Sequence, residues 1–389
     1  AVRDRAHHLL KLAEGDDLAH FSYVPEALSR TADYVCDLIK TNYPKLDIPL
    51  HSRFRHFETG GKNRLSEVGL DGLSPRDRGM MLVELTVVSV LLDAGAGDRW
   101  HYTEPQSGAI HTRSEGLAIA SWHMYWGGLF SSSGVPAVDA DRLDSLSQDT
   151  LAQAFQVTQD NPLVGLSGRL DLLRNLAGLL QAKASRFGAH GRLGLFYDHV
   201  VRLAVAGRIS AGRLLTAVLD TFSEVWPARL CLDGVSLGDV WEHAAFQSFP
   251  VAPGLIPFHK LSQWLTYSLI EPLAAGGIDV FDLDELTGLP EYRNGGLLID
   301  MAVLTPRVDG ALCRRYQPSD AFVVEWRGLT VAVLDRLADL IRQRLGHDQT
   351  TLPLANILQG GTWLAGRRLA FERRGGLSPV RIHSDGTVF

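Results

Sequence analysis

The chain has 389 residues, the size of two domains or of one large domain with an integrated subdomain. Hydrophobic residues make up 46% and charged residues 21%, a balance typical of a globular protein with a sizeable core. The formal net charge of −6 argues against a nucleic-acid partner, because an acidic surface repels phosphate backbones, although a few local cations can still hold a small anion.

Cysteine usage and hydropathy favour a cytoplasmic protein without a membrane partner. The three cysteines, Cys36, Cys231 and Cys313, lie far apart and form no CxxC pair, so neither a disulfide framework nor a cysteine zinc site is indicated. The most apolar run, 80–92, is too short to span a bilayer and contains Glu84, which is typical of a buried helix.

Helical periodicity dominates the chain, and alternating β-branched runs are scarce. Apolar residues recur at i, i+3, i+4 and i+7 in residues 31–41, 74–92, 115–130, 168–185, 194–206, 211–222, 261–273 and 321–345. The best strand candidates are 380–383, followed by the turn signal Asp385-Gly386, and 367–372. We therefore predict a mainly α protein with a small β appendage at the C-terminus.

Domain boundaries are weakly marked. Residues 131–136 carry turn chemistry between two helical stretches, and Asp160-Asn161-Pro162 is a second break. We place a boundary near residue 160. It divides an N-terminal helical subdomain, 1–160, from a C-terminal subdomain, 161–389, that contains the terminal β segment, with the active site between them.

The first candidate site segment is the basic stretch 52–64, which contains Arg55 and His56. Its several cations surround Gly60-Gly61, where backbone amides can approach a ligand, and this combination suits a small anion. A solvated basic loop is the plain alternative, and the residues leave both interpretations open.

The second candidate segment is 255–263, LIPFHKLSQ. Pro257 indicates that a helix begins nearby, which places His259 and Lys260 in its first turn. A helix N-terminus offers unpaired N–H groups, and with Lys and His these make a seat for phosphate. A surface Lys beside a packed His is the alternative.

The third segment, 278–316, is the richest in carboxylates. Asp282 is most simply interpreted as a residue that caps a short helix, since the macrodipole favours acidic residues there. Glu291 follows Leu289-Pro290 at a tight turn, and a carboxylate on such a corner can face a pocket.

The same segment resembles the helix-hairpin-helix DNA glycosylases. A Leu-rich helix is expected to lead to the turn, an apolar helix over 295–303 follows, and then comes Val308-Asp309-Gly310, in which Asp309 takes the position of the family's catalytic aspartate. The hairpin reads Pro-Glu-Tyr instead of Pro-Gly-x-Gly, which puts close approach of DNA phosphate in doubt. The implied fold is a helical, helix-hairpin-helix glycosylase-like one.

Glu325 and Arg327 open the last long helix. Residues two apart on a helix do not face each other, so each is expected to pair elsewhere, and a buried structural ion pair is the favoured interpretation over substrate binding. HxH and HExxH clusters, GxxxxGK[ST] and a Rossmann glycine pattern are absent from the sequence, so we expect neither a metal nor a cofactor.

Taken end to end, the chain resembles the uracil-catabolism family of fungi and bacteria. The matching stretches include SRFRHFETGGKNR, RSEGLAIASWHMYWGGLFSSSGVP, DNPLVGLSGR, IPFHKLSQWLTYSLIEPL, LTGLPEYRNGGLLID, VEWRGLTVAVLDRLA and SDGTVF. The order of segments is more distantly similar to the queuosine-salvage hydrolases, which release a modified base from its ribonucleoside 5′-phosphate. In those enzymes Asp-Tyr-Arg stands where this chain has Glu291-Tyr292-Arg293.

These resemblances imply cleavage of a C1′–N bond in a ribosyl 5′-phosphate that carries urea or a nucleobase-like group. Such cleavage passes through an oxocarbenium-like state, which a carboxylate stabilises. Glu291 or Asp309 is the expected carboxylate, and the other would bind the urea or base edge. His259, Lys260 and Arg293 would hold the phosphate, whose binding energy positions the sugar.

Asp282, Glu325 and Arg327 are further candidates for the pocket. Two other functions stay open at this point. The chain can be a non-catalytic helix-hairpin-helix module that binds nucleic acid, or a hydrolase of a ureido C–N bond in the same pathway. The first conflicts with the net acidity and with the missing hairpin glycines.

Overall fold

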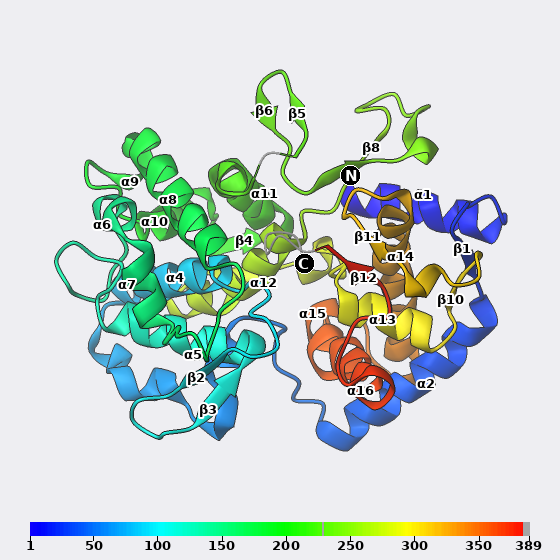
Figure 1. Cartoon of the computed structure of the whole chain (residues 1–389), viewed down its shortest axis with the longest axis horizontal. Helices are drawn as coiled ribbons and strands as arrows, with labels where there is room; N and C mark the ends of the chain where they lie inside the picture. The colour runs from blue at the N-terminus through cyan, green and yellow to red at the C-terminus, as the bar shows by residue number, and fades with distance from the viewer. Residues whose placement is uncertain (228, 384–389) are drawn as a thin grey trace.

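The computed structural model describes residues 1–227 and 229–383, and within them most of the chain is helical. Two groups of helices lie side by side, one drawn on the right of Figure 1 and the other on the left. In the described ranges, none of the helices combines the length and the apolarity needed to cross a membrane. The predicted mainly α fold is confirmed.

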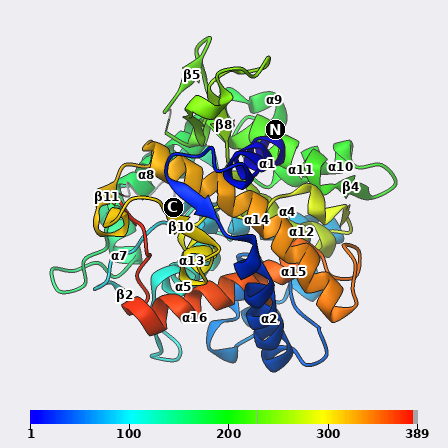
Figure 2. The ribbon, with the colours of Figure 1, turned by 90° about the vertical axis from the view of Figure 1, so that its right-hand side faces the viewer.

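The first group is formed by helices from the N-terminal and C-terminal parts of the chain. It consists of α1 (Val2–Glu14), α2 (Pro25–Asn42), α13 (Tyr292–Asp300), α14 (Ala321–Leu345), α15 (Leu354–Ile357) and α16 (Trp363–Arg374). The 25-residue helix α14 packs against α1, α2 and α13, and α16 packs against α13 (Figure 2). The middle of α14 is buried on nearly every side, as Leu329, Val331 and Val333 show. A helix that is apolar on every side is stable only at the centre of a core.

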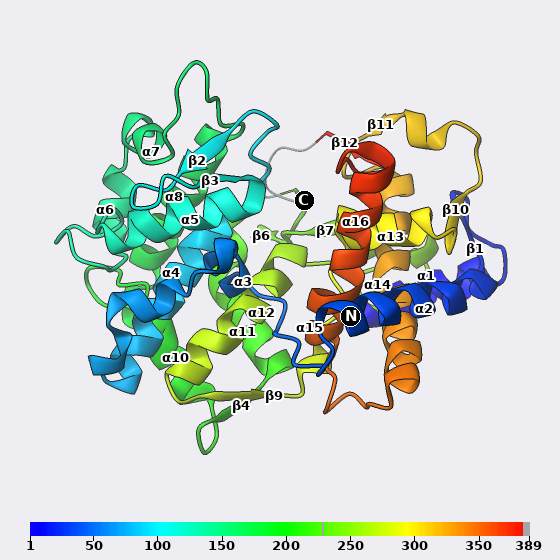
Figure 3. The same ribbon diagram turned by 90° about the horizontal axis from the view of Figure 1, so that it is seen from below.

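The second group contains the middle of the chain. It consists of α3 (Phe54–Phe57), α4 (Pro75–Leu91), α5 (Arg113–Trp126), α6 (Ala140–Ser145), α7 (Gln148–Ala154), α8 (Leu166–Ala182), α9 (Ala184–Phe187), α10 (Leu195–Leu203), α11 (Ala211–Phe222) and α12 (Lys260–Ala275). Its centre is α4, which packs against α5, α10 and α12. Figure 3 shows α5 of this group and α16 of the first group on opposite sides of the middle of the molecule.

The strands are short and form six two-stranded sheets in the described residues. Antiparallel pairs are β1 (Phe21–Tyr23) with β10 (Leu304–Pro306), β2 (His101–Thr103) with β3 (Ile110–Thr112), β5 (Cys231–Leu232) with β6 (Val235–Ser236), and β7 (Val240–Glu242) with β8 (Leu255–Pro257). Parallel pairs are β4 (Arg208–Ser210) with β9 (Asp279–Phe281), and β11 (Arg315–Tyr316) with β12 (Arg381–Ile382).

Single helical turns connect these elements. They are the 3₁₀ turns η1 (Thr59–Gly61), η2 (Arg64–Val68), η3 (Leu70–Gly72), η4 (Ser223–Val225), η5 (Ala244–Phe246), η6 (Leu283–Glu285) and η7 (Ala311–Cys313), and the π-helical turn η8 (Leu358–Thr362). Such π turns occur often at functional sites.

The C-terminal β appendage is confirmed in part. The predicted strand 380–383 contains β12, which pairs with β11. The other predicted strand, 367–372, is wrong, because these residues form the interior of α16, which buries Leu369 and Ala370 and leaves Phe371 exposed. The predicted turn Asp385-Gly386 lies outside the described residues.

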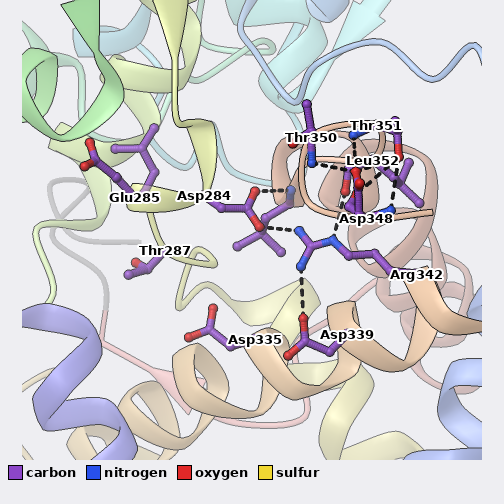
Figure 4. Close-up of polar contacts among 12 residues, drawn as sticks. Asp284, Glu285, Thr287, Asp335, Asp339, Arg342, Asp348, Thr350, Thr351 and Leu352 are labelled. Carbon is purple, nitrogen blue, oxygen red and sulfur yellow. Dashed lines mark hydrogen bonds and ion pairs between the residues drawn. The ribbon is translucent and has the colours of Figure 1, made fainter.

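The segment before the Leu289-Pro290 turn differs from the expected Leu-rich helix. It contains only η6, because the residues just before it pair in β9 and Asp282 has a left-handed φ of +53°, which interrupts regular structure. Asp284 holds η6 in place by accepting hydrogen bonds from the Arg342 guanidinium and from the Leu354 N–H (Figure 4). The corner is therefore fixed from α14 and α15 rather than by a first hairpin helix.

The N-terminal helices pack with the C-terminal ones. Residues 2–42 lie against α14, whereas the helices between residues 54 and 275 form the other group (Figure 1). The division of the chain near residue 160 stays a prediction about its folding units.

Candidate functional site

A cavity of about 340 Å³ lies between the two groups of helices. This volume is at the lower end of the range of about 300–1,000 Å³ for small-molecule sites. The second group contributes His51, His56, Asp93, Arg113, Ser114, Lys260 and Trp264 to its wall, and the first group contributes Glu291, Tyr292, Arg293 and Trp363. Of the residues predicted from the sequence, the cavity brings together Glu291, Lys260, Arg293 and His56.

Glu291 is the N-cap of α13. One carboxylate oxygen accepts a hydrogen bond from the Arg293 N–H at 2.9 Å, and the other accepts from the Asn294 N–H at 2.6 Å. Two otherwise unpaired donors of the helix are thereby satisfied, and the charge lies at the positive end of the helix dipole. The side chain is 8% exposed and its carboxylate is fixed at the cavity wall.

Lys260 is the first residue of α12. Its backbone N–H donates to Asp239 at 2.9 Å, while its ammonium group makes no hydrogen bond or ion pair with any residue that the structure describes. Burial lowers the pKa of Lys260, and the nearby Glu291 charge opposes that shift. An amine held at the wall without a partner can donate to an anionic ligand.

Arg327 supports this part of the wall from behind. Its guanidinium donates to both oxygens of Asp239, at 2.7 and 2.8 Å, and its Nε donates to the Pro290 carbonyl at 3.4 Å. Burial opposes the charge on Asp239, yet Arg327 and the Lys260 N–H hold the pKa of that carboxyl below its usual range. One buried side chain thus connects the start of α12 with the turn that carries Glu291.

Two guanidinium groups complete the positive lining. Arg293 is buried and stacks on Trp363, 4.3 Å from the ring centroid, and on Tyr292 at 5.2 Å. Arg113 is exposed and begins α5 with a left-handed φ of +55°. Within residues 1–227 and 229–383, Arg113, Arg293 and Lys260 have no carboxylate ion-pair partner.

Two histidines line the inner part of the cavity. The ring centroids of His51 and His56 lie 4.8 and 6.1 Å, respectively, from a ring centroid of Trp264. Burial lowers the pKa of His51 to about 3 and that of His56 to about 4. Both imidazoles are therefore neutral at physiological pH.

Arg53 is the hub behind His56. This fully buried side chain donates to His56 Nδ1 at 3.0 Å and to Asp93 at 2.9 Å, and its Nε donates to the Ser89 hydroxyl at 2.8 Å. The Ser114 hydroxyl donates to the other Asp93 oxygen at 2.5 Å. Asp93, just past the end of α4, is thus a second oriented carboxylate at the wall.

The remaining predicted residues lie elsewhere. Asp309 and Asp282 are exposed and outside this cavity. Glu325 is buried, accepts a hydrogen bond from the His20 N–H at 3.0 Å and lies 3.4 Å from His243 Nε2. Arg55 pairs with Glu271 and with Glu58 beside α3.

His259 is separate again. It has a left-handed φ of +47° and, together with Asp239, lines a separate small cavity of about 20 Å³. Of the neighbouring pair predicted from the sequence, only Lys260 lines the main cavity.

Sequence reasoning missed Asp93, Arg113, His51, Trp264 and Trp363. The bond from Arg53 to Asp93 spans 40 positions, and local spacing carries no sign of such a pair. His51 and Arg113 belong to stretches that the family resemblance quotes or adjoins, so conservation among relatives is the signal that could find them.

The arrangement combines two fixed carboxylates, three cations without carboxylate partners, two neutral imidazoles and aromatic faces. It can bind a small anion, stack a planar group and stabilise positive charge that develops on a bound sugar. No cluster of three or more His, Cys, Asp or Glu suited to a metal occurs in the part of the chain that the structure describes. Metal independence stays a prediction.

Comparisons with known proteins cover the chain from end to end. The family model described as "Protein of unknown function (DUF1688)" matches residues 1–389. The chain is 39% identical over 410 residues to Protein urg3 of Schizosaccharomyces pombe, covering 100% of this chain and 96% of that protein. It is 34% identical over 429 residues to Uracil catabolism protein 4 of Lachancea kluyveri, covering 100% of this chain and 97% of that protein.

Proposed function

The chain belongs to the DUF1688 family, and because a full-length relative is named for uracil catabolism, we propose that it is a hydrolase of that pathway. The proposed reaction cleaves the N-glycosidic bond of a ribosyl 5′-phosphate that carries urea or a nucleobase-like group. The observation that carries this proposal is that the Glu291 carboxylate shares one cavity with three cations that lack carboxylate partners.

The cations suit the phosphate of such a substrate. Lys260, Arg113 and Arg293 line the same cavity, and charge-assisted hydrogen bonds to phosphate are among the strongest that proteins make. The phosphate does not react, so its binding energy is available to orient the sugar above the carboxylate.

The carboxylate suits the reacting carbon. When the C1′–N bond breaks, its electron pair leaves with nitrogen and positive charge develops over C1′ and the ring oxygen. Glu291, held by two N–H groups, stabilises that charge without reorganising. A water adds its oxygen to C1′ and gives up a proton, and the nitrogen gains one. Asp93 is the second carboxylate that can orient the water.

The direct test is turnover of ribosylurea 5′-phosphate by the wild type, Glu291→Gln and Asp309→Asn. We expect urea and ribose 5-phosphate from the wild type. Loss of an electrostatic group at the reacting centre typically costs about 10²- to 10³-fold in kcat, so Glu291→Gln should lose that much. Asp309→Asn, at an exposed position, is the matched control and should keep wild-type turnover. A Glu291→Gln enzyme with wild-type kcat would overturn the assignment.

Product analysis also separates the competing functions. Release of ammonia and carbon dioxide with the glycosidic bond intact would mean cleavage of a ureido C–N bond instead. Salt-dependent nanomolar binding of DNA or RNA without any turnover would point to a helix-hairpin-helix nucleic-acid module. The net charge of −6 and the enclosed position of Glu291 support the small-molecule hydrolase over that module.

A further inference from the structure

The proposed reaction gives no role to the two histidines beside Trp264. His51 is buried and His56 is partly buried, both line the cavity, and they come from the segment just before α3 and from α3 itself. Each ring uses its Nδ1 to bond to a protein group, and each Nε2 has no hydrogen-bond partner among the described residues. Two polar atoms of the cavity wall are therefore available to a ligand.

The hydrogen bond to Arg53 fixes the tautomer of His56. A guanidinium group can only donate, so His56 Nδ1, 3.0 Å from Arg53 Nη1, must accept. A neutral imidazole that accepts at Nδ1 carries its proton at Nε2. His56 consequently presents an N–H donor to the cavity.

His51 has the opposite tautomer. Its Nδ1 lies 2.8 Å from Oε1 of Gln359, and a carbonyl oxygen can only accept, so Nδ1 carries the proton. The unprotonated Nε2 is then a hydrogen-bond acceptor. Gln359 belongs to the π-helical turn η8, which lies between α15 and α16 of the first group of helices. The cavity wall therefore offers one acceptor and one donor.

We propose that His51 and His56 recognise the nitrogenous leaving group by its amide edge. His56 Nε2 donates to a ligand carbonyl, and His51 Nε2 accepts from the adjacent N–H. This inference rests on the proposed function and specifies its substrate class, a ureide, either urea-like or a pyrimidine ring, in which C=O and N–H stand side by side. A leaving group without that pair would cover these two polar atoms and leave them unsatisfied, which strongly disfavours binding.

The recognition can be tested apart from turnover with two Asn variants. Asn reproduces only the Nδ1 side of an imidazole, so His51→Asn keeps a donor for Gln359 and His56→Asn keeps an acceptor for Arg53. Calorimetric titration with uracil and with urea, each in saturating ribose 5-phosphate, should show about tenfold weaker binding for each variant, the effect of one hydrogen bond of about 1.4 kcal/mol. The affinity for ribose 5-phosphate alone should stay within twofold of the wild type. His190→Asn, at an exposed site, is the control and should bind both ligands like the wild type.

The variant His56→Gln provides the opposite change, because Gln places an N–H near the imidazole Nε2 and loses the acceptor for Arg53. We expect His56→Gln to be less stable than His56→Asn and to bind uracil or urea more tightly than His56→Asn does. The reverse order of affinities, or unchanged affinity in both Asn variants, overturns the recognition proposal.

The outcomes also separate this inference from the proposed hydrolysis. If ribosylurea 5′-phosphate is not cleaved but uracil or urea binding is lost in the Asn variants, the recognition stands and the hydrolase proposal falls. If the wild type cleaves the substrate while His51→Asn and His56→Asn keep wild-type KM and leaving-group affinity, the hydrolase stands and the recognition falls.

Discussion

A carboxylate that caps a helix is held in one orientation by the helix itself, and Glu291 uses this effect at the cavity. Both of its oxygens accept backbone N–H groups of α13, so its position depends on that helix and not on a second charged side chain. The neighbouring Arg293, whose N–H is one of the donors, directs its own side chain onto Trp363. At the scale of single residues, the same contacts therefore serve both the start of α13 and the proposed chemistry.

Replacing Glu291 by Ala should lower both stability and activity. Loss of a capping side chain costs about 1 kcal/mol in the free energy of unfolding. Gln retains one carbonyl oxygen that can accept an N–H, so Glu291→Gln should lose clearly less. Urea denaturation of both variants, with turnover measured in parallel, checks this difference. Equal stability of the Ala variant and the wild type would show that the cap contributes nothing.

Replacing Lys260, in contrast to Glu291, should weaken ligand binding without lowering stability. Lys260→Met keeps the aliphatic stem and removes a half-buried charge that has no ion-pair partner within the described ranges, so stability should not fall. A lost charge-assisted hydrogen bond is worth about 1.5–3 kcal/mol, which should weaken ribose 5-phosphate binding about 10- to 100-fold.

The exposed Lys45 provides the matched control for this change, since Lys45→Met removes the same charge at the surface and should leave binding unaltered. Titration calorimetry measures both affinities. If Lys260→Met binds ribose 5-phosphate as tightly as the wild type, the ammonium group does not contact the phosphate.

At the scale of elements, local patterns predicted helices well and their partners poorly. The segment 211–222 forms α11 with the predicted ends, and Ser74 caps α4 by accepting from the Asp77 N–H, because these signals lie within one turn of chain. The strand predicted over 367–372 is wrong because a short apolar run such as Leu369 to Phe371 fits a helix as well as a strand. These residues belong to α16, which packs against α13 and buries Leu369 and Ala370.

The site shows the same division between local and long-range information. Glu291 and Lys260 could be predicted because a proline within three residues of each marks the turn or helix start that positions it. Asp93 could not, since Arg53 and Ser114, the residues that orient it, are 40 and 21 positions away. The prediction of Asp309 rests on a resemblance to a hairpin whose first helix is here a single turn, η6, and the residue is exposed.

The packing of α16 on α13 depends on a glycine, which leads to a prediction at the same scale. A Cβ at Gly366 would lie 2.0 Å from the Arg293 carbonyl oxygen, so Gly366→Ala must push α13 away and displace Glu291 with it. We expect Gly366→Ala to lower the free energy of unfolding by about 1–3 kcal/mol, the usual cost of overpacking, and to weaken ribose 5-phosphate binding.

Gly178→Ala in α8 is the matched control, because a Cβ there meets nothing within 4 Å. At that exposed helical position Ala should stabilise the protein by about 0.5–1 kcal/mol. Thermal unfolding of the two variants compares them directly. Equal melting temperatures would refute the close approach of α16 to α13.

At the scale of the whole molecule, the cavity lies where the two groups of helices meet. Lys260 and both histidines come from one group, and Glu291 and Arg293 from the other, so a bound ligand would contact both. Arg327, which bonds to Asp239 and to the Pro290 carbonyl, already joins the two sides within the protein. The acid stability of the molecule should therefore depend on groups buried at this junction.

His51 and His56 make that dependence measurable. Burial lowers their pKa values from 6.5 to about 3 and about 4, so between pH 6.5 and those values the unfolded chain binds more protons than the folded one. The stability that their neutral forms contribute is fully present above pH 6.5 and is lost as the pH falls, by about 2 kcal/mol per histidine at pH 5.

Urea denaturation at pH 7.5 and pH 5 should show this loss in the wild type, and His51→Asn and His56→Asn should each reduce the difference by about that amount. Because the same remaining groups titrate in all three proteins, their contributions cancel in the comparison. If both variants lose as much stability as the wild type between these pH values, the two imidazoles take up protons in the folded protein as readily as in the unfolded chain, and the neutral donor and acceptor assigned to the cavity would be wrong.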